Sequence, residues 1–231
     1  MFSFKHLTAY LFTAAVMVSL SPALASALAV HKHKTHDCDT STSVMDLPTG
    51  QTMLVAPPTA PLFILLGVGT QNYSCVGTAF TSIGAVASLF DISCLDHTPH
   101  FASIQSKAFD VWKDLPASAP LTAVGPLVGA PHLDGFHYFI PSASGTGLSP
   151  KWDFTSTTGN PSAFVVGARV GGIPAPTNPA VNIDWLSLNR SDGELAAQIF
   201  RVDTVGGQPP ASCVAGSGDI TVKYTAKYYL Y

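Results

Sequence analysis

Hydrophobic and polar side chains alternate most regularly at the C-terminus. Thr and Lys occupy most positions between a set of apolar and aromatic residues, namely Ile220, Val222, Tyr224, Ala226, Tyr228 and Leu230. A period of two is typical of a β-strand with one face in the core and the other in solvent. The pattern therefore predicts a half-buried strand at the end of the chain.

Six shorter runs also have β-type composition, and Gly, Pro, Ser or Asn separates nearly all of them. These runs cover residues 62–68, 85–92, 136–140, 163–170, 183–188 and 199–205. Many short strands with turns between them favour an antiparallel sandwich or barrel over a doubly wound sheet. Helical spacing occurs at Phe101, Ile104, Ala108, Val111 and Trp112. We therefore expect a mainly β fold with one or two short helices.

The N-terminus has the three parts of a secretory signal peptide. Lys5 and His6 precede a 14-residue apolar run, and an Ala-rich stretch follows it. A membrane anchor is the alternative, but a spanning helix needs about 20 apolar residues. We expect a signal peptide over residues 1–25, with an end between 25 and 29. A polar arm over 30–52 and one β domain over 53–231 would follow.

The cysteines then predict two disulfides. Cys38, Cys75, Cys94 and Cys213 are an even number in an exported chain, where thiols oxidise. All three connectivities remain open, and the spacing lacks the close pairs of a zinc site. Asn72 and Asn189 each begin an Asn-X-Ser sequon. Asn189 is the better glycosylation site, because it lies beside a polar turn.

Composition narrows the classes of partner. Of the 231 residues 11% are charged and the net charge is -3, so a basic surface for nucleic acid is excluded. Hydrophobic residues make up 47%, which excludes a disordered chain. After the signal peptide no run approaches spanning length, so we expect no membrane span. The expected location is secreted, either extracellular or associated with the cell wall.

Several ordered segments resemble one known family. The segments are GVGTQNYSC (67–75), GAVASLFD (84–91), GFHYF (135–139), IDWL (183–186), RVDTVGG (201–207) and YTAKYYLY (224–231). Together they resemble a domain-of-unknown-function family of secreted fungal and bacterial proteins, over about residues 48–231. The resemblance implies membership and no particular activity.

Members of that family often carry the label of malate dehydrogenase. A nicotinamide enzyme of that kind needs G-x-G-x-x-G at a turn from a strand into a helix. Here Gly67 and Gly69 are followed by Thr70, Gln71 and Asn72, and then by a β-type stretch. We therefore do not expect an NAD-dependent malate dehydrogenase.

Two kinds of residue are candidates for ligand binding. Gln71 and Asn72 offer donors and acceptors for a sugar or small polar ligand, although amides also satisfy backbone groups at turns and edge strands. Trp152 follows Pro150 and has charged neighbours on both sides, so we expect it on the surface, where it suits carbohydrate or lipid. Trp185 suits the core instead.

Candidates for catalysis and metal binding are fewer. A hydrolytic group would draw on Asp91, Asp153 and His137, although dispersed aspartates also serve as turn and cap residues. A nucleophilic serine motif is missing from the sequence, and the cysteines are assigned to disulfides. The arm residues His31, His33 and His36 have ligand types that suit copper, nickel or zinc. We assign no catalytic residue, no metal site and no cofactor.

The leading interpretation is a secreted, non-catalytic binding or structural module whose partner is a cell-wall glycan, a lipid or a host protein. An extracellular hydrolase acting on carbohydrate is the first alternative, and a secreted effector is the second. An enzyme would gather two or more candidate groups in one pocket with shifted pKa values. The sequence leaves the oligomeric state open.

Overall fold

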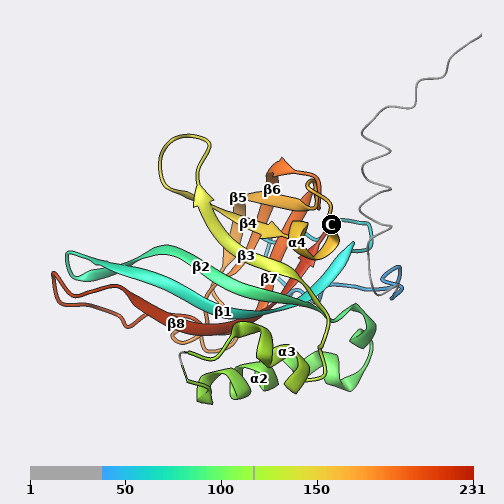
Figure 1. The fold of residues 1–231 in the computed structure, drawn as a ribbon, viewed down its shortest axis with the longest axis horizontal. Helices are drawn as coiled ribbons and strands as arrows, with labels where there is room; N and C mark the ends of the chain where they lie inside the picture. Colours follow the sequence, from blue (N-terminus) through green and yellow to red (C-terminus); the bar gives the residue numbers. More distant parts are fainter. Residues whose placement is uncertain (1–37, 117) are drawn as a thin grey trace, which may run out of the picture.

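The computed structural model describes residues 38–116 and 118–231, which form a closed antiparallel barrel of eight strands (Figure 1). Each strand pairs with the next along the chain, and β8 pairs back to β1. The strands are β1 (Phe63–Val76), β2 (Ala79–Asp91), β3 (Leu133–Pro141), β4 (Leu148–Asp153), β5 (Phe164–Ile173), β6 (Trp185–Gly193), β7 (Gln198–Gly206) and β8 (Ile220–Leu230). The predicted mainly β antiparallel fold is confirmed. Its barrel alternative is right and its sandwich alternative is wrong.

The helices are few, and α2 (Pro99–Asp114) is the one among the described residues that is longer than four residues. The others are η1 (Ser93–Leu95), η2 (Leu121–Ala123), α3 (Val124–Leu127) and α4 (Thr155–Thr158). Among the strands β4 has no counterpart in the sequence prediction. A long extension projects beyond the barrel and is formed by β1, β2 and the start of β8 (Figure 1).

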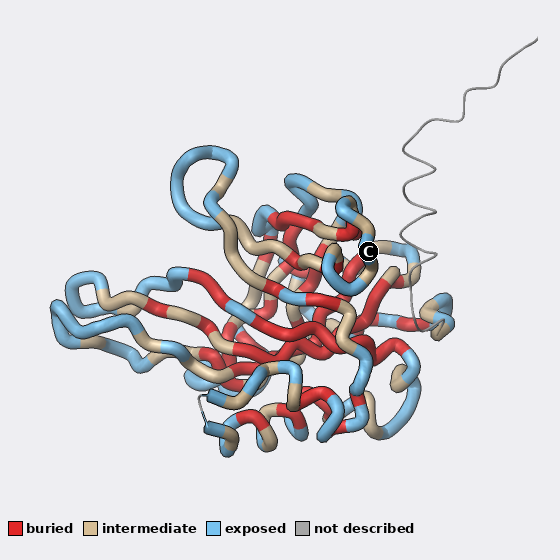
Figure 2. Tube along the Cα trace, in the orientation of Figure 1, coloured by how far each residue is buried: buried red, intermediate tan, exposed pale blue. Residues whose placement is uncertain are grey.

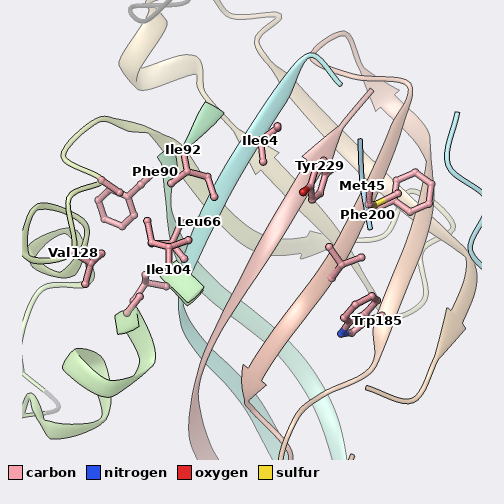
Figure 3. Close-up of a cluster of buried hydrophobic side chains, with 14 of the residues drawn as sticks. Met45, Ile64, Leu66, Phe90, Ile92, Ile104, Val128, Trp185, Phe200 and Tyr229 are labelled. Atoms are coloured by element: carbon pink, nitrogen blue, oxygen red, sulfur yellow. The ribbon is translucent and has the colours of Figure 1, made fainter. Parts of the chain in front are cut away.

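Strand alternation divides the apolar side chains into two clusters. Phe63 and Leu65 of β1 belong to the cluster inside the barrel, together with Leu89, Trp152, Val165 and Ile199. Ile64 and Leu66 point the other way and belong to an outer cluster. The outer cluster also contains side chains from α2, β7 and β8 (Figure 3). The parts of β1, β7 and β8 that lie between the two clusters are therefore buried on both faces, as the tube in Figure 2 shows.

Helix α2 covers the outer face of the barrel at β1 and β8. Its predicted three-four spacing places Ile104, Ala108 and Trp112 on the buried side, which confirms the helix. The Nε1 atom of Trp112 donates a hydrogen bond to the carbonyl oxygen of Gly69 in β1 at 2.8 Å. Lys223 of β8 donates from Nζ to the carbonyl oxygen of Trp112 at 2.9 Å. The same carbonyl oxygen also accepts the backbone N–H of Leu115 at 3.3 Å, where the helix ends.

This helix explains why the prediction of a half-buried C-terminal strand is wrong over residues 224–230. These residues are buried on both faces, because Tyr224 and Tyr228 face the barrel interior while the alternate residues lie beneath α2. Lys227 is 3% exposed. Its Nζ pairs with Asp203 Oδ2 at 2.9 Å and lies 4.2 Å from the ring centroid of Phe101. A buried cation needs such partners.

The two predicted disulfides are confirmed, and their pairing is Cys38–Cys94 and Cys75–Cys213. The first joins the segment before the barrel to η1. The second joins the hairpin of β1 and β2 to the loop before β8. Met45, from the segment before the barrel, is buried in the outer cluster with Trp185 and Phe200 (Figure 3).

Residues 1–37 lie outside the described residues. They include the predicted signal peptide over residues 1–25 and the start of the predicted polar N-terminal arm, with His31, His33 and His36. Within the described residues, no helix has both the length and the apolar character needed to cross a membrane.

Candidate functional site

One end of the barrel holds a cavity of about 230 Å³ that opens to solvent. The strands are antiparallel, so the C-terminal halves of β1, β3, β5 and β7 meet at this end. We call it the barrel mouth, and its lining residues are Gln71, Tyr73, Ser82, Phe139, Arg169, Ile183, Asp184, Leu186, Arg201 and Gln208. An eight-stranded barrel is just wide enough to be filled by side chains or to hold one small ligand.

Two arginines give the barrel mouth its charge. The chain has only three arginines, and Arg169 and Arg201 both line the cavity, with Asp184 as the acidic residue among the lining groups. Arg201 donates from Nε and Nη2 to the backbone carbonyl oxygen of Asp184, at 3.2 and 2.9 Å. The Asp184 carboxylate lies 4.0 Å from Arg169 Nη2. The guanidinium of Arg201 is thereby oriented, and both arginines retain N–H donors for a ligand.

Gln71 provides an unsatisfied donor at the same place. It lies on β1, is 6% exposed and lines the cavity. Its Nε2 atom has no hydrogen-bond partner within bonding distance among the described residues, although the Gln71 side chain is close enough to Tyr224 to oppose the rise of the pKa of that tyrosine. A buried donor without a partner costs about 1–3 kcal/mol, so such groups call for an explanation. A ligand acceptor in the barrel mouth would supply the missing partner.

Tyr73 closes one side of the cavity. Its hydroxyl donates to the backbone carbonyl oxygen of Gly207 at 2.7 Å, which fixes the ring across the mouth. Burial raises the pKa of Tyr73 to about 12, although the nearby positive charge of Arg201 opposes the shift. The phenol therefore stays protonated at neutral pH and remains a donor.

A layer of polar aromatic side chains lies inside the barrel. The hydroxyls of Tyr224 and Tyr228 are 2.9 Å apart, and burial raises the pKa of both tyrosines. His137 of β3 stacks on Trp152 of β4, with ring centroids 4.4 Å apart, and lies 5.8 Å from the ring centroid of Tyr228. Arg201 is close enough to Tyr228 to oppose the rise of its pKa. The polar character of the mouth thus continues into the barrel.

His137 is a neutral residue in this layer. Burial lowers its pKa to about 4, against a weaker opposite effect of its bond to Lys151. The Nδ1 atom lies 2.9 Å from the backbone carbonyl oxygen of Lys151. A carbonyl oxygen only accepts, so Nδ1 carries the proton and Nε2 is left as an acceptor.

The three catalytic candidates have separate surroundings. Asp91 ends β2, and its Oδ1 accepts a hydrogen bond from the backbone of Ser93 at 2.8 Å. Asp153 pairs with Lys151 at 2.8 Å. Burial would raise the pKa of Asp153, but hydrogen bonds from Lys151, Tyr138 and Thr155 outweigh it and hold this pKa well below its usual range. Because Asp153 and Trp152 are neighbours on a strand, they face opposite sides, and His137 lies on the Trp152 side.

The ligand-binding candidates are also separated. Gln71 lines the mouth, while Asn72 is half-buried and its Oδ1 accepts from the Thr70 hydroxyl at 3.1 Å. The expectation that Trp152 lies on the surface is wrong, because it is 2% exposed inside the barrel. Its charged neighbours point outward on the alternate face. Its Nε1 atom, like Gln71 Nε2, has no hydrogen-bond partner in the part of the chain that the structure describes.

The structure shows where the preferred sequon residue lies and how possible metal ligands are distributed over the described residues. Asn189 is exposed on β6, where Gln198 Nε2 donates to its Oδ1 at 3.2 Å, and its glycosylation stays a prediction. Within residues 38–116 and 118–231, no group of three or more His, Cys, Asp or Glu side chains is arranged to hold a metal.

The glycines of the GVG segment have a packing role in β1. A Cβ atom on Gly67 would lie 2.5 Å from Cε2 of Tyr228, and one on Gly69 would lie 1.9 Å from the backbone oxygen of Val86. Gly67 therefore makes room for a tyrosine of the interior layer. This segment is a strand in the barrel wall, not a turn that opens a helix.

Sequence reasoning missed Arg169 and Arg201 as site residues. One signal was available: arginines are rare in this chain, and two of them fall within predicted β-type runs. Arg201 follows Ile199 at the period of a strand, which places it on the inward face.

Fold and site together define a class, an up-and-down β-barrel with a polar, arginine-bearing mouth above an aromatic interior. A comparison with protein-family models assigns the chain to a family. The chain belongs to the family described as "Protein of unknown function (DUF3455)", whose model matches residues 56–231. The suspected resemblance to a domain-of-unknown-function family is thus confirmed. Comparisons with curated proteins and with solved structures found no match.

Proposed function

We propose that this protein is a secreted binding protein that holds one small ligand with an anionic group in the barrel mouth. The observation that carries the proposal is the convergence of Arg169, Arg201 and the unpartnered amide of Gln71 on one cavity. Small-ligand sites are concave and carry a few convergent polar groups, which is the arrangement found here.

The donors suit an anionic acceptor such as a carboxylate. Arginine guanidinium groups bind carboxylates through two parallel N–H bonds, and charge-assisted bonds are the stronger kind. Gln71 would donate a further bond from Nε2. The carbonyl oxygen of Asp184 holds Arg201 in place, so part of the ordering precedes binding.

The secreted location is supported by two independent features. The N-terminal pattern of a basic start, a short apolar run and Ala-rich cleavage positions is that of an export signal. Two disulfides suit an oxidising compartment. The wall glycan, lipid and host protein considered for the partner differ in charge, and the arginines favour an acidic or carboxylate-bearing one.

Butanoate is a suitable first probe, since it is little more than a carboxylate. We expect ligand-observed NMR to show saturable binding to the mature protein. Arg169→Gln should weaken that binding at least fivefold. The third arginine gives a matched control, because Arg190 is exposed away from the mouth, and Arg190→Gln should change the affinity less than twofold. Equal affinity of both variants, or no binding by the unchanged protein, would contradict the proposal.

A further inference from the structure

A second, larger cavity opens sideways through the barrel wall between β4 and β5, with a volume of about 520 Å³. We call it the side cleft. Most of its lining is apolar and includes Phe139, Leu148, Pro150, Val166, Leu186 and Leu188, while its polar lining residues are Ser142, Ser149, Arg169, Ser191 and Asp192. An apolar opening in a barrel wall differs from the polar barrel mouth and calls for a separate explanation.

The strand pairing shows why the wall opens here. β4 pairs with β3 along its whole length, from Leu148 to Asp153. Its pairing with β5 involves Lys151, Trp152 and Asp153. The first half of β4 is thus held by β3 on one side and borders the side cleft on the other. Pro150 lies in that half and has no backbone N–H to donate.

The side cleft and the barrel mouth are adjacent. Phe139, Arg169 and Leu186 line both cavities. Arg169 therefore stands where the apolar and the polar space meet. Asp192 of β6 also lines the side cleft. It is paired with Val166 of β5, whereas Arg169 lies farther along β5 and is paired with Leu188. The carboxylate of Asp192 is thus away from the junction, and the positive end of the cleft is the end at the mouth.

We infer that the ligand is an anionic amphiphile with an aliphatic chain, whose charged head lies in the barrel mouth and whose chain lies in the side cleft. This inference rests on the proposed function, because the head uses the same arginines. Charge complementarity fixes the orientation: the head needs Arg169 and Arg201, and the chain needs the apolar walls beyond Leu186. Burial of the chain would add affinity in proportion to the apolar area removed from water.

A comparison of three probes tests the inference by calorimetry on the mature protein, with every probe kept below its micelle concentration. Dodecanoate has both head and chain, butanoate has little chain, and dodecyltrimethylammonium has the chain with the opposite charge. We expect dodecanoate to bind at least tenfold more tightly than butanoate and than the ammonium probe. Equal affinity of the two carboxylates would overturn the inference and leave the proposed function intact. Failure of both carboxylates to bind would overturn both.

A pair of leucine variants locates the chain. Leu148→Asp places a charge in the side cleft, at a residue that is 48% exposed. It should weaken dodecanoate binding at least fivefold and change butanoate binding less than twofold. Leu127→Asp is the matched control, because Leu127 is 65% exposed on α3 and belongs to neither cavity. If both variants weaken dodecanoate equally, or if the ammonium probe binds as well as dodecanoate, the inference is wrong.

Discussion

Two walls of this barrel are built differently. In the wall of β8, β1 and β2, the central strand β1 pairs with both neighbours over most of its length, and α2 covers the outer face. We call it the covered wall. In the wall of β3, β4 and β5, the side cleft separates β4 from β5 beyond their short region of pairing. We call it the open wall. The covered wall is the more extensively paired and packed of the two, and our proposal assigns ligand entry to the open wall.

The largest effect should come from the disulfides, which join η1 after β2 to the segment before the barrel, and β1 to the loop before β8. Reduction should lower the free energy of unfolding by about 2–5 kcal/mol for each disulfide. Urea denaturation with and without dithiothreitol measures the change, and intact mass confirms that the thiols are free. An unchanged midpoint with free thiols would show that the covered wall does not depend on its cross-links.

Trp112→Ala should have the next largest effect. Trp112 is 2% exposed and bonds α2 to β1, so its loss removes packing and a hydrogen bond together. Large-to-small changes of this kind cost about 3–5 kcal/mol. Urea denaturation of the variant gives the value directly. A loss below about 1 kcal/mol would mean that α2 contributes little to the stability of the covered wall.

His137 of β3 belongs to the open wall and predicts a pH dependence. Its pKa is about 4 in the folded protein and about 6.5 in an unfolded chain. Between these values the unfolded chain binds a proton that the native state does not, so stability falls as the pH drops from about 6.5 to 4. The full loss is about 3 kcal/mol, and His137→Gln should abolish this contribution. Asp153 affects stability at lower pH, because its pKa is held below the ordinary value of 3.8. Its contribution to the free energy of unfolding is present above that value and is lost as the pH falls below it.

Denaturation midpoints at several pH values compare the unchanged protein with His137→Gln. The two curves should run parallel above pH 6.5 and separate below it. The same slope in both proteins between pH 4 and 6.5 would show that His137 is not the buried neutral group of the interior.

Leu148→Asp should have the smallest effect on stability. Its side chain belongs to the open wall and is partly exposed, so the free energy of unfolding should change by less than about 0.5 kcal/mol. Circular dichroism melting curves check this value. A loss of several kcal/mol would show that the side cleft is part of the packed core, and the contrast between the walls would then fail.

The sequence predicted the covered wall better than the open one. The spacing of Ile104, Ala108 and Trp112 identified α2, and the alternation at the C-terminus identified β8. Periodicity cannot show that a helix covers the second face of β8, so Lys227 was expected in solvent. The disulfide pairing depends on which strand ends meet, which is a property of the closed barrel.

In the open wall, β3 and β5 were predicted, and β4 escaped prediction for local reasons. β4 is short, contains Pro150 and carries charged residues on one face, so it lacks the composition of a strand. Trp152 was assigned to the surface from its neighbours in sequence, although alternate residues of a strand face opposite sides. For the site, Gln71 was found from its amide chemistry. Arg169 and Arg201 were missed because they come together only when β5 and β7 meet at the same end of the barrel.

The most direct test of the central claim is an NMR titration of the isotope-labelled mature protein with butanoate. The side-chain amide of Gln71 and the Nε–H of Arg201 lie in the barrel mouth, while the indole N–H of Trp112 is bonded to Gly69 in the covered wall. We predict saturable shifts of the first two signals and no shift of the third. Shifts at Trp112 without shifts at Gln71 and Arg201 would contradict the claim that the barrel mouth is the binding site.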